Sequence, residues 1–82
     1  MQRKEINDKV RALLAEELQL NVNQVLDLSG PRTIAGWTSL THVRIIIAVE
    51  EYFSIRFSNS ELVELISVKR ISDALALKLA DT

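Results

Sequence analysis

The side chains best suited to chemistry lie in one short stretch that contains Ser39 and His42. Ser39 offers a hydroxyl that could act as a nucleophile or receive a covalent group, and His42 follows at a spacing from which an imidazole could reach that hydroxyl on a helix. A nucleophile and base pair is disfavoured, because no G-x-S-x-G elbow surrounds the serine and no carboxylate is evidently placed to orient the imidazole. We therefore expect no catalytic residue and interpret His42 as a histidine at a helix edge.

The position of Ser39 suits a phosphate group. The serine opens an apolar segment that runs from Thr41 to Phe53, and it follows a loop that contains Gly36. Free backbone amides and the positive end of the helix dipole stabilise a phosphate at a helix N-terminus. A Thr-Ser pair before an apolar helix is also a common N-cap without further function. Both interpretations stay open on the local sequence.

Several other classes of site are disfavoured by composition. The chain has no cysteine and one histidine, so a Cys/His zinc site is excluded, and no phosphate-binding glycine pattern or EF-hand loop is present. A formal net charge of −1 gives no strong field for nucleic acid or an anionic membrane. The longest apolar run, 45–49, is far too short to span a bilayer. We expect no metal, no nucleic-acid partner, no membrane insertion and a cytoplasmic monomer.

The elements that must position Ser39 are helical. With 82 residues, 48% of them hydrophobic, the sequence predicts one all-α domain over residues 1–82. Apolar residues recur at helical spacing from residue 3 to about 19, which predicts an amphipathic first helix. Residues 21–37 form a long connection, expected to be pinned to the bundle by its apolar side chains, with one short helical turn within 23–28.

The second half of the chain predicts two further helices after the one that Ser39 opens. Residues 54–57 alternate polar and apolar residues without a partner strand, which indicates an extended connector. Ser58 and Glu61 fit a capping box for a short helix over about 60–65, and Ser67 is expected to cap a last helix that reaches about Ala80.

The helix that follows Ser39 is apolar over most of its circumference. On a helical wheel, one narrow polar stripe contains Thr41, Arg44, Ala48 and Glu51. We expect the rest of this helix to be buried between neighbours, and the stripe to be what a partner could touch.

The stretch Trp37-Thr38-Ser39-Leu40, followed by an apolar helix that ends in Glu50-Glu51-Tyr52-Phe53, resembles acyl carrier proteins and the carrier domains of polyketide and nonribosomal peptide synthesis. The resemblance covers nearly the whole chain. It implies a four-helix acyl-carrier-like bundle, with three main helices, one short helix and a long loop between helices 1 and 2. It also implies that a phosphopantetheinyl transferase attaches 4′-phosphopantetheine from coenzyme A to Ser39.

In that family the arm carries an acyl or aminoacyl group as a thioester, so the resemblance implies a carrier substrate of other enzymes and not an enzyme. Its partners would be the transferase and a loading ligase or synthase, expected to belong to specialised lipid, polyketide or nonribosomal-peptide-type synthesis. The residues expected to contact partners are Trp37, Thr38, Leu40, Thr41, Arg44 and Glu51. For Trp37, holding the loop on the bundle is an equal alternative.

Two residues depart from the family. Thr38 stands where the family has an aspartate before the serine, so a negative charge that the modifying enzyme reads is missing. We expect slow modification, a dedicated transferase, or a degenerate carrier fold that serves as an interaction module or adaptor without covalent cargo. Arg44 reverses the sign of a surface that is acidic in fatty-acid carriers, so partners of that pathway are expected to dock poorly.

Overall fold

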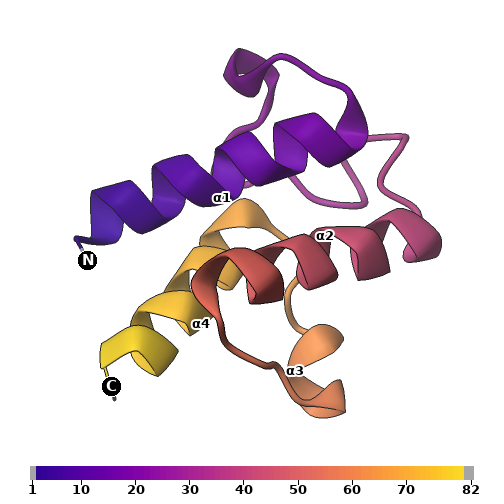
Figure 1. Cartoon of the computed structure of the whole chain (residues 1–82). Helices are drawn as coiled ribbons and strands as arrows, with labels where there is room; N and C mark the ends of the chain where they lie inside the picture. The colour runs from indigo at the N-terminus through magenta and orange to yellow at the C-terminus, as the bar shows by residue number, and fades with distance from the viewer. Residues whose placement is uncertain (1, 81–82) are drawn as a thin grey trace.

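The computed structural model describes residues 2–80, which contain four α-helices and one 3₁₀ turn and no strand. The helices are α1 (Arg3–Leu18), α2 (Ser39–Phe53), α3 (Asn59–Leu62) and α4 (Val68–Ala80), and the 3₁₀ turn η1 is Val22–Gln24. Both α2 and α4 pack against α1, whereas α3 lies beyond α2 on the side away from α1 (Figure 1). The predicted all-α bundle, with three main helices, one short helix and a long first loop, is confirmed. Within these residues every helix is too short or too polar to span a bilayer.

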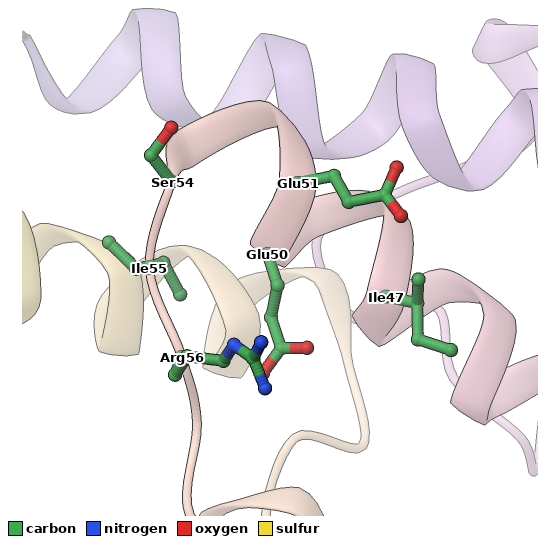
Figure 2. A pocket seen from close by; sticks show the side chains of 6 residues that line it. All are labelled: Ile47, Glu50, Glu51, Ser54, Ile55 and Arg56. Atoms are coloured by element: carbon green, nitrogen blue, oxygen red, sulfur yellow. The ribbon is translucent and has the colours of Figure 1, made fainter.

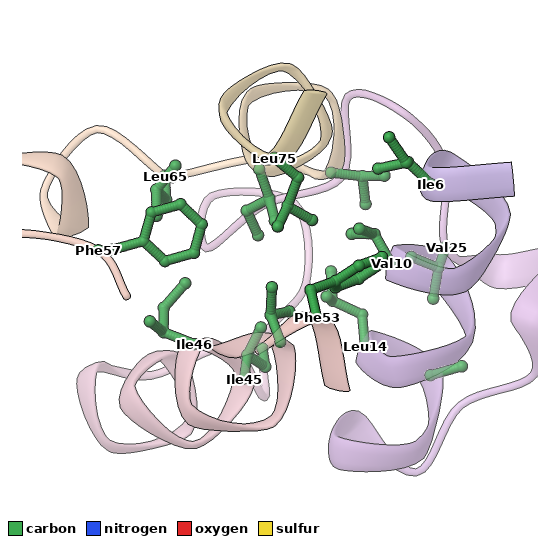
Figure 3. Close-up of a cluster of buried hydrophobic side chains, with 14 of the residues drawn as sticks. Ile6, Val10, Leu14, Val25, Ile45, Ile46, Phe53, Phe57, Leu65 and Leu75 are labelled. Atoms are coloured by element: carbon green, nitrogen blue, oxygen red, sulfur yellow. The ribbon is translucent and has the colours of Figure 1, made fainter. Parts of the chain in front are cut away.

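The core lies where the three long helices meet, and each contributes one apolar face (Figure 3). Side chains from the segment around α3 close the core at one end, where Phe57 and Leu65 approach Ile46 of α2. These contacts bury the apolar residues that recur at helical spacing in the sequence. Burial of such a face is what stabilises helices of this length. The largest fully buried apolar side chains are Ile6, Val10, Leu14, Val25, Ile45, Val49, Val68, Ile71 and Leu75.

The predicted caps of the last two helices are present. Ser58 and Glu61 form a capping box around the start of α3, and the Ser67 hydroxyl accepts a hydrogen bond of 3.1 Å from the backbone N–H of Arg70 in α4. The short helix ends at Leu62, earlier than predicted, because the chain turns there and buries Leu65 in the core.

The long first loop is attached by a few apolar side chains and by polar contacts, so the expectation that its apolar residues pin it holds only in part. Val25 and Trp37 are buried and Ile34 is half-buried, while Val22, Leu26 and Leu28 are exposed. Arg11 of α1 also holds the loop, because its guanidinium donates to the carbonyl oxygens of Val25 at 2.6 Å and Val22 at 3.0 Å. The helical turn also begins one residue earlier than the predicted segment.

The loop is joined to α4 as well. The backbone N–H of Val68 donates to the carbonyl of Ser29 at 3.2 Å, and the N–H of Lys69 donates to the carbonyl of Asp27 at 2.9 Å. Helix N-terminal N–H groups have no partner within their own helix, so the loop carbonyls satisfy two of them. The loop that leads to Ser39 is thereby fixed to both α1 and α4.

Candidate functional site

Ser39 is the first residue of α2, and its side chain is exposed. The residue before it, Thr38, has an extended backbone and caps the helix, since its hydroxyl accepts a hydrogen bond of 3.3 Å from the backbone N–H of Thr41. Of the two hydroxyls that could cap the helix, the structure therefore uses Thr38. Ser39 keeps a hydroxyl that has no hydrogen-bond partner within residues 2–80.

The start of α2 fits a phosphodiester. The backbone N–H groups of Ser39 and Leu40 have no acceptor among the described residues, whereas His42 N–H donates to the Thr38 carbonyl at 2.8 Å. Free amides, the helix dipole and an exposed hydroxyl are together what a phosphate ester on Ser39 requires.

Trp37 is buried, with 3% of its surface exposed. Its indole Nε1–H donates to Nδ1 of His42 at 2.9 Å. The expectation that this ring contacts a partner is contradicted, and the alternative that it holds the loop on the bundle describes its position. A buried indole N–H needs an acceptor, and His42 supplies one.

His42 uses both ring nitrogens within the domain. Because the Trp37 N–H can only donate, Nδ1 of His42 must accept, and Nε2 carries the proton. That Nε2–H donates to the carbonyl of Leu62, the last residue of α3, at 3.1 Å. The histidine is half-buried at the helix edge, as expected, and neither nitrogen is free to act as a base for Ser39.

One side of α2 is apolar and exposed, so the expectation that this helix is buried outside its polar stripe is wrong. Leu40, Val43 and Ile47 are 65%, 51% and 47% exposed. Helix α1 covers one side of α2, and Phe57 and Leu65 cover another, which leaves the third side open. The signal for this was available, because the chain has too few other helices to surround one that is apolar on all sides.

The charged residues predicted for partner contact share this open side of α2. Arg44 and Glu51 are exposed, and neither side chain forms an ion pair or hydrogen bond within residues 2–80. Thr41 is half-buried, and its hydroxyl lies 3.2 Å from the capping hydroxyl of Thr38. We name the set Leu40, Val43, Arg44, Ile47 and Glu51 the open face of α2.

A surface pocket at the other end of α2 is separate from Ser39. It lies around the C-terminus of the helix and the connector that follows, and it is lined by Ile47, Glu50, Glu51, Ser54, Ile55 and Arg56 (Figure 2). At 1.5 Å per residue, its far end is about 20 Å along the helix from Ser39. The carboxylate of Glu50 accepts the backbone N–H of Phe57 at 2.8 Å, which gives it a structural role. No three metal-ligating side chains gather within residues 2–80.

Comparison with known proteins agrees with this geometry. The sequence model of the phosphopantetheine attachment site family matches residues 8–75. An acyl carrier protein of Thermosynechococcus vestitus is 29% identical over 80 residues, which cover 98% of this chain and 99% of the relative. The match includes α2, the loop before it and the exposed serine at its start. The chain belongs to the phosphopantetheine attachment family, whose covalent group is 4′-phosphopantetheine.

Proposed function

We propose that this protein is an acyl or aminoacyl carrier whose 4′-phosphopantetheine arm is attached to Ser39. The observation that carries the proposal is the exposed, unpartnered hydroxyl of Ser39 at the first residue of α2, within the region that matches the family. The protein would be a substrate of other enzymes and would itself catalyse nothing. We propose that it is a cytoplasmic monomer.

The attachment step needs little from the carrier itself. The Ser39 oxygen attacks the pyrophosphate of coenzyme A on a transferase; a phosphodiester forms, the hydroxyl proton leaves, and adenosine 3′,5′-bisphosphate departs. The N–H groups of Ser39 and Leu40 lie where they can donate to the phosphodiester oxygens. When attached, the arm supplies a thiol that holds the cargo as a thioester.

The open face of α2 is the proposed contact surface for the transferase and for a loading ligase or synthase. Leu40, Val43 and Ile47 offer apolar area, while Arg44 and Glu51 offer one charge of each sign. Charge complementarity chooses partners and sets encounter rates, so Arg44 favours a partner with an acidic residue at that point. We infer that the loading partner is a dedicated ligase or synthase of specialised lipid, polyketide or nonribosomal-peptide-type synthesis.

The test is the intact mass of the protein after incubation with coenzyme A, magnesium and a promiscuous phosphopantetheinyl transferase. Wild type should gain the mass of one phosphopantetheine, and Ser39→Ala should gain none. Ser60→Ala is the matched control, because Ser60 is also exposed and near the start of a helix, but should be modified like wild type. A gain in Ser39→Ala would refute the assignment of this serine.

The alternative function is an adaptor with a carrier fold and no covalent cargo, and Thr38 is the residue that favours it. Thr38 caps α2 as an aspartate would, but it brings no charge for a transferase to read. An adaptor should keep its function in cells when Ser39 becomes alanine, whereas a carrier should lose it.

A further inference from the structure

We propose that His42 is a positioning residue that holds the Ser39 end of α2 and ties it to α3. The proposal rests on Ser39 being the attachment point. The two hydrogen bonds of the His42 ring, which we call the tie, can however be observed without any attached arm. One bond joins the ring to Trp37 in the first loop, and the other joins it to Leu62 in α3.

His42 fixes the chain before Ser39 at two consecutive residues. Its backbone N–H donates to the carbonyl of Thr38 at 2.8 Å, and its ring accepts the indole N–H of Trp37 at 2.9 Å. Ser39 follows these two residues directly. The backbone bond is the first hydrogen bond of the helix and would form with other residues at this position, so the contribution of the histidine itself is the ring contact with Trp37, two residues before Ser39.

Helix α3 depends on side chains from the other helices, because four residues cannot form a stable helix alone. Three side chains hold this segment by polar contacts: Glu50 binds the N–H of Phe57 at 2.8 Å, Lys78 binds Glu61 at 3.1 Å, and His42 binds the carbonyl of Leu62 at 3.1 Å. Of these three side chains, His42 is the one that also contacts the loop before Ser39.

The tie lies between two exposed apolar residues. Val43 follows His42 on α2, and Val63 follows Leu62 at the end of α3; both are exposed. An enzyme that reaches Ser39 across α2 and α3 therefore meets two surfaces that the His42 ring joins next to both exposed residues, in addition to the contacts of Glu50 and Lys78. Loss of the tie should lower kcat for modification of Ser39 while the bundle stays folded.

The test compares three substitutions of His42. His42→Phe removes both hydrogen bonds but keeps a ring; His42→Asn places an amide near the position of Nδ1 and can still accept from Trp37; His42→Gln places one near Nε2 and can still donate to Leu62. Glu50→Ala is the matched control, because it frees the same segment at Phe57 without touching the Trp37 contact. Each protein is studied by ¹H–¹⁵N correlation spectra and by kcat and KM for the transferase.

The single tryptophan gives one indole signal that reports the tie. We expect His42→Phe to shift that signal together with the amide signals of Ser39 and of the α3 segment, and to lower kcat about tenfold, which lies within the net strength of the two lost hydrogen bonds. His42→Asn should leave the indole signal at its wild-type position, and His42→Gln should shift it as His42→Phe does. Each of these two variants should have a kcat between those of wild type and His42→Phe. Glu50→Ala should move the α3 signals alone and keep kcat.

Unchanged Ser39 amide and indole signals in His42→Phe would refute the tie. Equal kcat in His42→Phe and Glu50→Ala would refute the positioning role. Failure of the proposed attachment looks different, because wild type itself would then gain no mass while the indole signal still responds to His42→Phe. If the phenylalanine variant does not fold, the asparagine and glutamine pair makes the same comparison.

Discussion

Gly30 packs against the backbone of Ile66 so closely that a Cβ on Gly30 would lie 2.2 Å from the Ile66 carbonyl oxygen. Here the first loop crosses the connection between α3 and α4. The neighbouring hydrogen bond from Val68 N–H to the Ser29 carbonyl joins the same two segments. Gly30 does not have a positive φ, so its backbone conformation does not require glycine. Glycine is needed at this position because a side chain would collide with the backbone of Ile66.

Gly30→Ala should therefore destabilise the fold by about 2 kcal/mol or more, because the added carbon meets a backbone atom that cannot rotate away. Chemical denaturation measures the effect. Gly36→Ala is the matched control in the same loop, since nothing lies within 4 Å of its added Cβ. It should be neutral or slightly stabilising. Equal losses in the two variants would contradict the crossing at Gly30.

The acid sensitivity of α3 follows from Glu61. Hydrogen bonding from the backbone N–H of Ser58, and then from the Lys78 ammonium, holds the pKa of the Glu61 carboxyl below its ordinary value of 4.5. Because the pKa is lower in the folded state than in the unfolded state, the carboxylate stabilises the fold at pH values above its ordinary pKa. This stabilisation is lost as the pH falls through the lower pKa of the folded state.

Glu61→Gln should thus be less stable than wild type near neutral pH, by less than about 1 kcal/mol because the pair is partly exposed, and the difference should vanish in acid. Glutamine can still accept the Ser58 N–H, so the variant isolates the charge. Unfolding midpoints measured from neutral pH to below pH 4 test this. Glu64→Gln, which changes an exposed glutamate without an ion pair in the described chain, is the control. A difference that grew in acid would contradict the argument.

Features set by neighbouring residues were predictable from the sequence. The limits of α1, the cap of α4 at Ser67 and the Ser58–Glu61 box all depend on side chains within one or two turns. The exposed hydroxyl of Ser39 at a helix start was predictable for the same reason, because a helix N-terminus has a local signature.

Features set by distant residues were not predictable. The burial of Trp37 depends on the His42 ring, whose orientation depends in turn on the carbonyl of Leu62. The first loop is held by Arg11 and by the start of α4, and polar contacts of this kind leave no periodic pattern in a sequence. For α2, the small number of helices implied that part of its apolar surface stays uncovered. Which side that is could not be predicted, since an apolar helix surface looks alike whether or not another element covers it.

Thr38→Asp should speed modification of Ser39 a few-fold with a broad-specificity transferase. The aspartate keeps an N-cap acceptor for Thr41 N–H and adds the negative charge that favours a helix N-terminus and completes the family motif. Thr38→Ala is the control, because it removes the cap, should cost about 1 kcal/mol of stability, and should not speed modification. Initial rates measured side by side decide; an unchanged rate in Thr38→Asp would mean that Thr38 is not what limits the reaction.

The open face of α2 should contribute to partner binding with little effect on folding. Val43 and Ile47 are about half exposed, so replacing both with alanine removes apolar contact area from the surface and leaves the fully buried core in place. We expect KM of the carrier for its transferase to rise several-fold. Stability should fall by about 1 kcal/mol or less.

Leu77→Ala is the matched control for that surface, because Leu77 is 73% exposed on α4. It removes a similar apolar side chain without altering α2, so KM should stay at the wild-type value. Arg44→Glu adds an electrostatic test on the same face: its effect on the association rate should shrink as salt is added, because surface charges are screened. If Leu77→Ala raises KM as much as the double variant does, the contact surface is not specific to α2, and the partner covers more of the bundle than the open face.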